Sequence, residues 1–396
     1  MQNQFDVVIV GAGPAGSAAA KKLATAGFSV MVYDRREELG VPVRCGEGVG
    51  KNIEDYTGPI PRRAICQDIR GFRIYAPNGK FLEATGLGYV LDRKVFDKWL
   101  AEEAIKAGAR VQANTLITEL IIEGSYIRGV RGKYMDAPFE ARAKLVISAT
   151  GSESPLAMQA GIRTPCPMHL VDTCVEYEMT GIKYARPDDH EYIHICLGNE
   201  IAPRGYFWIF PKSRDGANAG VGVTPSTDMS KSALHYQDKF IKAHPELFSK
   251  ASIIEVKAGA MPVGGLLKDM VANGFIVCGE AAHHVNPIHG GGIKEAIISG
   301  HIAADVASKC LKSGDVSKEA LSEFNKKWWT ERGEHLAKVE KLREVVEKLS
   351  DDDLNDLADA LKPEDIVEFS RGARLSVLAK ALMRKPRLIT LARHLI

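Results

Sequence analysis

The chain has 396 residues, 45% of them hydrophobic, with 52 Lys and Arg against 50 Asp and Glu. This composition excludes an intrinsically disordered chain, a collagen-like repeat and a small disulfide scaffold, and the net charge of +2 argues against a nucleic-acid-binding protein. The length predicts two or three domains, with a core large enough to need no disulfide or structural metal.

The N-terminal residues predict a β-α-β unit that opens an α/β domain. Residues 5–10 form an apolar run typical of a buried strand, residues 17–26 have a helical pattern, and residues 29–33 form a second apolar strand. Three glycines between the first strand and the helix have the spacing of a dinucleotide-binding turn. The first permits a tight turn, the second lets the backbone approach a pyrophosphate, and the third lets helix and strand pack closely. They are Gly11, Gly13 and Gly16.

The end of the second strand supports a dinucleotide site. Asp34 stands where such proteins place an acid against the ribose hydroxyls. The helix N-terminus, including the N–H of Ala15, favours a phosphate. An acid at this position suits an unphosphorylated ribose, and therefore FAD or NAD rather than NADP. A glycine-rich turn that binds nothing is the alternative, but strand, helix, second strand and terminal acid all agree with a cofactor site.

The later segments predict an inserted sheet and a helical end. Residues 89–107, 110–122 and 144–149 continue the first domain with a helix and strands. Strand-like segments separated by turn residues follow and predict an antiparallel sheet. Residues 275–278 then return to the buried-strand pattern, a helix spans 293–312, and the rest of the chain has the pattern of charged helices. The segments of the inserted sheet are 168–179, 191–197, 204–211, 218–224 and 253–260.

A segment after the inserted sheet resembles the FAD-dependent hydroxylase and reductase superfamily. Its members carry a strand ending in Gly-Asp-Ala-Ala-His, then a Pro and a glycine-rich loop before a long helix. Here Gly-Glu-Ala-Ala-His spans 279–283, and Gly-Gly-Gly spans 290–292. The resemblance implies a Rossmann-like FAD-binding domain of the p-hydroxybenzoate hydroxylase type, with an inserted antiparallel-sheet substrate domain and a C-terminal helical region. We assign residues 1–49, 89–165 and 259–315 to the discontinuous FAD-binding domain, 50–88 and 166–258 to the substrate domain, and 316–396 to the helical region.

The same resemblance implies contacts with the flavin. Gly279 and Glu280 are expected to meet the ribityl–pyrophosphate region. Gly291, Gly292 and Ile293 are expected to pack against the pyrimidine edge, where a helix N-terminus stabilises an anionic reduced flavin. Glu280 stands where the superfamily usually has Asp, so a direct contact of this longer acid with the ribityl chain stays open.

Three further segments are similar to the geranylgeranyl reductase family. They are Arg-Cys-Gly-Glu-Gly at 44–48, Leu-Asp-Arg-Lys-Val-Phe-Asp at 91–97, and Gly-Tyr-Phe-Trp-Ile-Phe-Pro-Lys at 205–212 followed by Gly-Val-Gly at 220–222. The resemblance implies an FAD-dependent oxidoreductase of membrane lipid biosynthesis. It would saturate C=C bonds in geranylgeranyl chains of archaeal ether phospholipids, with a hydride from reduced flavin and a proton. Cofactor contacts are then also expected from Cys45, Gly46, Gly48, Arg93 and Ile117.

The aromatic run fits a prenyl site. Alternation along a strand puts Tyr206, Trp208 and Phe210 on one face, where they would line a tunnel for an isoprenoid chain. Their π-faces would also steady a developing carbocation. An ordinary aromatic core stripe is the alternative, and the flavin motifs favour the tunnel. Gly220 and Gly222 are assigned to the same substrate site.

Two residue types leave alternatives open. Cys45 is our candidate catalytic residue, because a thiol beside a flavin can be redox-active or can donate a proton, but it can also merely pack. His283, His284 and His289 suggest a metal site, but no carboxylate or Cys completes a ligand set, so we predict no metal. Thr150 replaces the Asp that many aromatic hydroxylases have there, which lowers the weight of a monooxygenase.

The C-terminal residues 371–396 contain seven Lys and Arg and no Asp or Glu, so the rest of the chain carries a net charge of −5. A basic amphipathic segment of this kind can lie on an anionic bilayer or hold a phosphate headgroup. We assign Arg371 and Gly372 to the headgroup end of the substrate site, and we expect peripheral contact with membrane lipid. A solvated helix pair packed on the core is the alternative.

Partners and compartment are expected as follows. Seven scattered cysteines without a Cys-x-x-Cys pair indicate a reduced cytoplasmic protein, and neither a signal peptide nor a transmembrane helix is predicted. The substrate is a geranylgeranylated glycerophospholipid, and the external electron donor, reduced ferredoxin or a pyridine nucleotide, stays open. The rival functions are an FAD monooxygenase of the same fold and a non-catalytic prenyl-binding escort protein.

Overall fold

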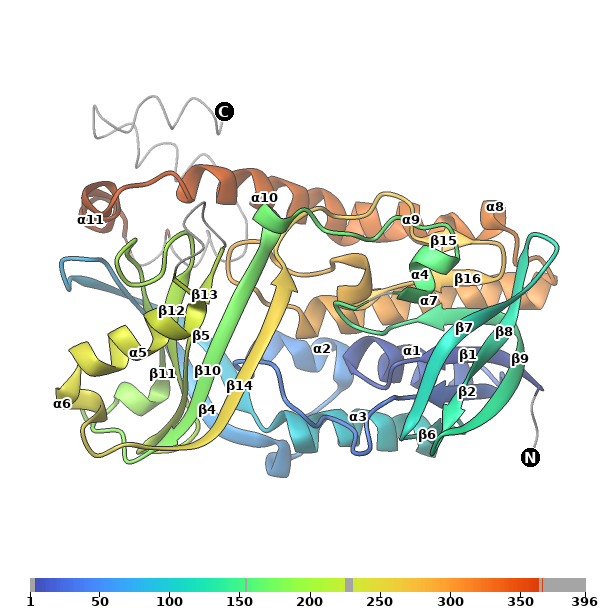
Figure 1. The fold of residues 1–396 in the computed structure, drawn as a ribbon, viewed down its shortest axis with the longest axis horizontal. Coiled ribbons are helices and arrows are strands. Elements are labelled where there is room, and N and C mark those ends of the chain that lie inside the picture. Colours follow the sequence, from blue (N-terminus) through green and yellow to red (C-terminus); the bar gives the residue numbers. More distant parts are fainter. Residues whose placement is uncertain (1–3, 154, 225–230, 363–364, 366–396) are drawn as a thin grey trace.

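The computed structural model describes residues 4–153, 155–224, 231–362 and 365. Two β-sheets lie toward opposite ends of an elongated molecule, and helices fill the space between and above them (Figure 1). The first sheet is built mainly from the N-terminal third of the chain and the second from its middle. The architecture confirms the predicted FAD-oxidoreductase fold with an inserted sheet and C-terminal helices.

The first sheet has the order β15-β16-β9-β1-β2-β6, with the hairpin β7–β8 joined to β9. Its centre is parallel: β1 pairs in parallel with β2 and β9, and β9 pairs in parallel with β16. Strand β2 is apolar and buried throughout, and β1 is so from Val7 to Val10, because helices cover both faces of such a sheet. The strands are β1 (Gln4–Val10), β2 (Val30–Tyr33), β6 (Arg110–Gln112), β7 (Thr115–Glu123), β8 (Tyr126–Tyr134), β9 (Ala137–Ser148), β15 (Val271–Ala272) and β16 (Phe275–Val277).

The second sheet has the order β14-β10-β13-β12-β11-β4-β5-β3 and is antiparallel except where β11 runs parallel to β4. Its middle strand β13 is buried along its whole length. The sheet takes in residues 48–49, 89–91 and 259–262, which were assigned to the first domain from the sequence. Its strands are β3 (Gly48–Gly50), β4 (Ile65–Tyr75), β5 (Phe81–Leu91), β10 (Val171–Thr180), β11 (Tyr192–Cys196), β12 (Tyr206–Pro211), β13 (Gly216–Val223) and β14 (Ser252–Pro262).

Two helices, α1 and α7, pack closely along each other. Helix α1 packs along α7, with Gly300 of α7 so close to α1 that a Cβ there would lie 2.3 Å from the Ala15 carbonyl oxygen. The C-terminal helices run along the upper side of the molecule in Figure 1. The helices are α1 (Pro14–Thr25), α2 (Glu54–Thr57), α3 (Arg93–Lys106), α4 (Pro155–Gln159), α5 (Ala233–Ala243), α6 (Pro245–Phe248), α7 (Ile293–Ser313), α8 (Lys318–Leu321), α9 (Glu323–Trp328), α10 (Glu334–Val346) and α11 (Asp351–Ala360).

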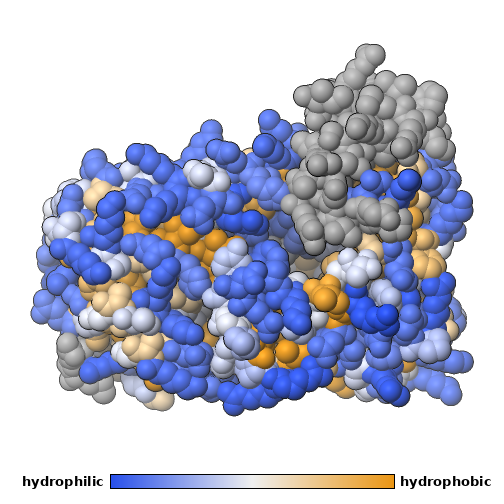
Figure 2. All heavy atoms as spheres, turned by 180° about the vertical axis from the view of Figure 1, so that it is seen from behind, coloured by the Kyte–Doolittle hydropathy of each residue, from blue (hydrophilic) through white to orange (hydrophobic). Residues whose placement is uncertain are grey.

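The surface is mainly polar on the face drawn in Figure 2, where apolar side chains gather in small separate patches. Across the described residues, no helix combines the length and the apolar character needed to cross a bilayer. All seven cysteines are described, and each thiol is free.

One buried arginine ties the C-terminal helices to the second sheet. Arg343 of α10 is only 6% exposed. Its guanidinium donates to the Asp172 carboxylate of β10 at 2.7 Å, to the Thr224 hydroxyl at 2.7 Å and to the Pro287 carbonyl oxygen at 2.7 Å. It also pairs with Glu347, one turn further along the chain. A single side chain therefore joins a helix, a strand of the second sheet and the loop that precedes α7.

We expect Arg343→Met to lower the free energy of unfolding by about 3–5 kcal/mol, because it leaves the buried Asp172 carboxylate without its cation. Urea unfolding at constant pH measures this loss. The matched control is Arg62→Met, which removes an exposed pair with Asp68 and is expected to cost less than about 1 kcal/mol. Equal losses for the two variants would contradict the role of Arg343 as the joint.

Candidate active site between the two sheets

The glycine-rich turn after β1 combines two tightly packed glycines with one that faces open space. A Cβ at Gly11 would lie 2.2 Å from the Ala149 carbonyl oxygen, and φ there is +105°. A Cβ at Gly16 would lie 1.9 Å from the carbonyl oxygen of Gly11. At Gly13, by contrast, no atom lies within 4 Å of that position. The turn therefore packs at its first and third glycines and leaves the second open to a pyrophosphate.

The N-terminus of α1 faces the same open space. Gly13 is the N-cap of α1, and the first helical hydrogen bond joins the Ser17 N–H to the Gly13 carbonyl oxygen at 2.9 Å. The N–H groups before Ser17 have no acceptor within the helix, and the positive end of the helix dipole points outward. Gly279 packs against this turn, since a Cβ there would lie 2.9 Å from Ala15 Cβ. Two segments far apart in sequence thus meet at the predicted phosphate site.

Asp34 holds the turn in place from the end of β2. Its carboxylate accepts the Ala12 N–H at 2.8 Å on one oxygen and the Arg36 N–H at 2.9 Å on the other. Each oxygen keeps a further lone pair for a ribose hydroxyl. The predicted ribose contact is therefore compatible with a second role of Asp34 that the sequence analysis did not include.

Glu280 fits a polyhydroxyl ligand. It lies in the short turn after β16 and is partly accessible to solvent. Burial raises its pKa, against the opposing charges of Arg93 and Arg36. No other residue in the described part of the chain forms an ion pair or hydrogen bond with its carboxyl group. A partly buried carboxyl group that no described residue binds suits the ribityl hydroxyls of FAD, so the residues present fit the cofactor.

The glycine-rich loop before α7 touches the aromatic strand of the second sheet. Gly292 is the N-cap of α7, and Gly290 has φ of +66°. A Cβ at Gly290 would lie 2.7 Å from Met261 Cε. The Tyr206 hydroxyl of β12 donates to the His289 carbonyl oxygen at 2.8 Å. His289, which contacts the predicted prenyl-binding residue Tyr206, therefore lies two positions before Gly291. The predicted flavin-edge residues run from Gly291 to Ile293.

The loop that carries Cys45 also lies against the aromatic strand. A Cβ at Gly46 would lie 3.0 Å from the Phe210 ring and 3.3 Å from Trp208 Nε1, and a Cβ at Gly48 would lie 2.9 Å from the same Phe210 ring. The ring centroids of Trp208 and Phe210 are 6.2 Å apart, and those of Tyr206 and Trp208 are 5.8 Å apart. The aromatic face of β12 is thus bordered by the Cys45 loop and the loop before α7.

Gly220 and Gly222 make room for the indole of Trp208. They lie on β13 opposite Trp208 and Tyr206. A Cβ at Gly220 would lie 2.4 Å from Trp208 Cζ2, and one at Gly222 would lie 3.2 Å from Cys174 Sγ. Their nearest role is to let the aromatic ring lie flat on the neighbouring strand. Direct contact of these two glycines with substrate remains a prediction.

Cys45 keeps its proton at neutral pH. Its sulfur accepts the Glu47 N–H at 3.2 Å, and burial raises the pKa of the thiol, against the opposing charge of Arg93. Arg93 itself forms a bidentate pair with Asp97 at 2.6 and 2.7 Å. The neutral thiol suits proton donation or packing better than thiolate chemistry.

The remaining predicted site residues lie elsewhere. Ile117 of β7 is 6% exposed and belongs to the core of the first sheet. Its contact with the cofactor remains a prediction. Arg371 and Gly372, together with the basic segment 371–396, lie outside the described residues.

His283 and His284, near the glycine-rich loop, make contacts within the fold. Both ring nitrogens of His283 lie against backbone carbonyl oxygens, of Gly265 at 2.8 Å and Thr164 at 2.9 Å. His284 stacks on Trp328 with 3.8 Å between ring centroids. In the described part of the chain, no three His, Cys, Asp or Glu residues are placed to hold a metal ion.

A buried charge cluster that was not predicted from the sequence lies beside the aromatic residues of β12, on the same face of the second sheet. We call it the Glu176 cluster. It consists of three carboxylates, two ammonium groups and an amide. Lys257 lies 3.2 Å from Glu176, 3.1 Å from Glu178 and 3.5 Å from Glu47, and Lys212 lies 2.8 Å from Glu47. The signal was present in β10, where two acids alternate with apolar residues and therefore share a face. The members are Glu47, Glu176, Glu178, Lys212, Lys257 and Asn218.

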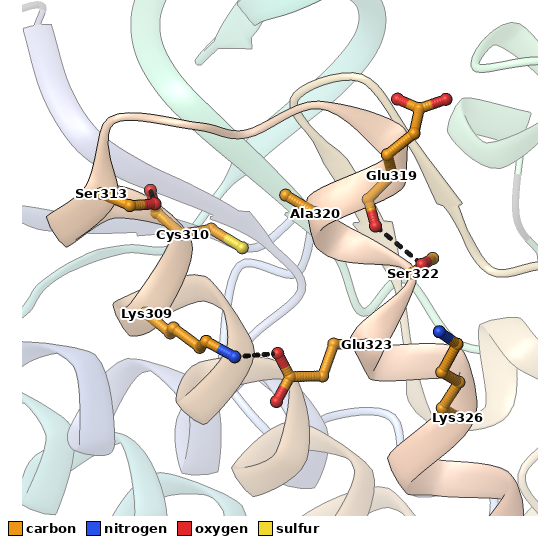
Figure 3. Close-up of a pocket in the computed structure, with 8 residues that line it drawn as sticks. All are labelled: Lys309, Cys310, Ser313, Glu319, Ala320, Ser322, Glu323 and Lys326. Atoms are coloured by element: carbon orange, nitrogen blue, oxygen red, sulfur yellow. Dashed lines mark hydrogen bonds and ion pairs between the residues drawn. The ribbon is translucent and has the colours of Figure 1, made fainter.

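A separate surface pocket lies at the far end of α7 (Figure 3). It contains an ion pair of Lys309 with Glu323 at 2.5 Å and a hydrogen bond from the Ser322 hydroxyl to the Glu319 carbonyl oxygen at 2.7 Å. Lys309 is about 25 Å along the helix from Gly292 at ~1.5 Å per residue. None of the predicted site residues lines this pocket.

Comparisons with known proteins agree with this site. Residues 171–261 match the family model described as geranylgeranyl reductase catalytic domain, and residues 6–200 match that of FAD-dependent oxidoreductases. A digeranylgeranylglycerophospholipid reductase of Methanocella arvoryzae is 38% identical over 98% of each chain. A reductase of the same name from Methanosarcina acetivorans is 40% identical over 97% of this chain and 94% of its own.

Solved structures give the same relation. A geranylgeranyl bacteriochlorophyll reductase-like protein from Thermoplasma acidophilum superposes with a TM-score of 0.90 and 30% identity over the whole of both chains. A flavin-dependent brominase superposes with a TM-score of 0.77 over 93% of this chain and 94% of its own, at 18% identity. The brominase shares the fold alone.

We expect Gly13→Ala to weaken FAD binding at least about tenfold, or ~1.4 kcal/mol, while the apoprotein unfolds at the wild-type midpoint. The added methyl group meets no protein atom, so it occupies only the space that a pyrophosphate needs. Titration of apoprotein with FAD by flavin fluorescence, together with thermal unfolding, measures both effects. Gly259→Ala is the control, since its methyl group would meet only Arg44 at 3.7 Å. Unchanged FAD affinity in Gly13→Ala would place the pyrophosphate elsewhere.

We also expect the rate of Cys45 alkylation to keep rising with pH beyond the range in which a free thiol levels off. Burial raises the thiol pKa, so the reactive thiolate forms only at higher pH. Iodoacetamide labelling followed by peptide mass spectrometry gives the rate for Cys45, with glutathione in the same tube as the reference. Fast labelling of Cys45 at pH 7 would contradict a protonated thiol.

Proposed function

This chain belongs to the digeranylgeranylglycerophospholipid reductase family and is an FAD-dependent oxidoreductase, and we propose that it saturates C=C bonds in geranylgeranyl chains of glycerophospholipids. The observation that carries the proposal is the aromatic face of β12, which lies between the Cys45 loop and the glycine-rich loop before α7. An apolar chain on that face would lie beside the part of the site that suits a flavin ring.

The described residues suit each part of the cofactor. The open side of Gly13 and the N-terminus of α1 would hold the pyrophosphate. Asp34 would accept ribose hydroxyls, and Glu280 would meet the ribityl chain. The loop that ends at Gly292 would meet the pyrimidine edge. When bound and reduced, FAD supplies a hydride to one alkene carbon.

The protein must help an unreactive alkene. An isolated C=C bond is a poor hydride acceptor, so a proton must reach one carbon while the other takes the hydride. The hydride and the proton together would convert the C=C bond to CH–CH. Positive charge that develops on the chain would lie against the π-faces of Tyr206, Trp208 and Phe210. These rings also exclude water, which would otherwise trap the cation.

Cys45 is the proposed source of the proton. The residue is only partly buried, its thiol keeps its proton at neutral pH, and it lies in the loop that borders the aromatic face. Arg93, held by Asp97, would orient the loop through its backbone N–H, which donates to Glu47 at 2.8 Å. The basic segment 371–396, with Arg371 and Gly372, is proposed to meet the phosphate headgroup and the membrane surface.

Anaerobic incubation of dithionite-reduced protein with digeranylgeranylglyceryl phospholipid tests the proposal. We expect mass spectrometry of the lipid to show successive additions of H2, with oxidation of the flavin in step. Dithionite serves as the reductant because the physiological donor, ferredoxin or pyridine nucleotide, is a separate question.

Three results would contradict the proposal. Reduced flavin that persists beside unchanged lipid would exclude saturation. A hydroxylated product that forms only with oxygen would indicate a monooxygenase. A purified protein without flavin absorbance would indicate an escort protein.

A further inference from the structure

The Glu176 cluster lies beside the aromatic side chains of β12, on the sheet face where the proposed reaction develops positive charge. Trp208 joins the cluster to the aromatic face: its indole N–H donates to Glu176 Oε2 at 2.8 Å, and its ring stands beside Gly46. Glu176 is 3% exposed and Glu47 is 1% exposed. A carboxylate is thus bonded to the N–H edge of an aromatic ring whose neighbours belong to the proposed substrate site.

The cluster contains three acidic side chains and only two basic ones. Glu47, Glu176 and Glu178 share the ammonium groups of Lys212 and Lys257. When all five are ionised, the cluster carries a net charge of −1 in a site that water barely reaches. A buried cluster of this composition tends to take up one proton.

Glu176 is the acid that takes this proton. Glu47 accepts from Lys212 at 2.8 Å, from the Asn218 amide at 2.7 Å and, on its other oxygen, from the Arg93 N–H at 2.8 Å. The two lysines hold the pKa of Glu47 low despite its burial. Glu178 likewise accepts from both lysines, and its pKa is lowered.

Glu176 has fewer partners. Its Oε1 lies 3.2 Å from Lys257 Nζ but accepts no hydrogen bond from the described residues, and burial raises its pKa to about 7. The groups that face Glu176 come from every neighbouring element. They are Lys257 on β14, Trp208 and Lys212 on or after β12, Asn218 and Gly220 on β13, Cys174 and Glu178 on β10, and Cys45 and Glu47 in the loop.

We propose that Glu176 is a positioning residue for the saturation reaction, whose negative charge acts through the Trp208 indole to stabilise positive charge on the prenyl chain. The proposal rests on the proposed function. An indole whose N–H is bonded to a carboxylate has a more electron-rich face, and a cation is attracted to that face. Protonation of Glu176 removes the charge and leaves the ring in place. The cluster therefore works as a pH-dependent aid to catalysis that acts through the Trp208 ring.

The direction of the pH dependence follows from the protonation state of Glu176 that promotes the reaction, which is the ionised one. Below pH 7 Glu176 is mainly protonated, and above it mainly ionised. The rate of the saturation step is therefore expected to rise as pH increases through about 7. Folding stability runs the other way, because an acid whose pKa is raised in the folded state costs stability once it ionises.

Glu176→Gln tests the proposal, since glutamine still accepts the indole N–H but carries no charge. Single-turnover oxidation of the reduced FAD enzyme by lipid, followed anaerobically at several pH values, gives the rate of the step. We expect a rate about tenfold below wild type at pH 8 and the loss of the rise near pH 7. Infrared difference spectra of the substrate-free protein should show a carboxylic acid C=O band that titrates in wild type and is absent from the variant.

Two further variants keep the test decisive. Glu255→Gln removes an acid of the same sheet that pairs with Lys94 at 3.0 Å outside the cluster, and it is expected to keep the wild-type pH profile. Trp208→Phe removes the indole N–H, so its rate should no longer follow the ionisation although the infrared band still titrates. It also replaces Glu176→Gln as the test if that variant does not fold.

The outcomes separate the two proposals. Lipid saturation by wild type, together with an unchanged pH profile in Glu176→Gln, overturns the role of Glu176 alone. A wild-type protein that saturates no lipid overturns both, whatever the infrared titration shows. Loss of the pH dependence in Glu176→Gln and Trp208→Phe, with Glu255→Gln unchanged, supports the role of Glu176.

Discussion

The close contact of the Trp208 indole with two backbone segments is the constraint on which the site depends. On one side β13 has to pass at Gly220, where a Cβ would lie 2.4 Å from the ring. On the other side the Cys45 loop has to pass at Gly46, where a Cβ would lie 3.3 Å from the indole nitrogen. Any side chain at Gly220 would push the ring out of its place. Strand, ring and loop are therefore fixed together, and the thiol that we propose as proton source is fixed with them.

The charges beside this ring are costly to bury, and the structure compensates for most but not all of the cost. Replacing a buried ionic cluster by apolar residues is often neutral or stabilising, so stability alone gives no reason to keep one. Here the acids outnumber the bases, and the least satisfied acid is the one bonded to the aromatic ring. A cluster selected only for stability would have matched its charges. The mismatch beside the proposed alkene site is what favours a functional origin.

Much of the fold followed from local patterns, and the parts that did not have a physical reason. The β-α-β unit has glycines, an acid and apolar runs that act over short distances, so its turn was predictable residue by residue. Strand β4 and all of β5 except its end at residues 89–91 were missed because half-buried strands mix polar and apolar residues, although Asn78-Gly79 between them is a strong hairpin signal.

The site divides in the same way. The aromatic alternation predicted one face of β12 correctly, whereas the Glu176 cluster joins residues up to 210 positions apart, from Glu47 to Lys257, which no local pattern reveals.

The C-terminal region supports the same site from behind. Arg343 of α10 binds the Pro287 carbonyl oxygen, and the next residues of that loop lead to His289, whose own carbonyl oxygen accepts the Tyr206 hydroxyl. The guanidinium also binds Asp172, on the strand that carries Glu176. One buried cation therefore holds both the loop proposed to meet the flavin edge and the strand that holds the charge cluster. Because packed interiors have low compressibility and transmit strain, α10 helps to set the distance between that loop and that strand.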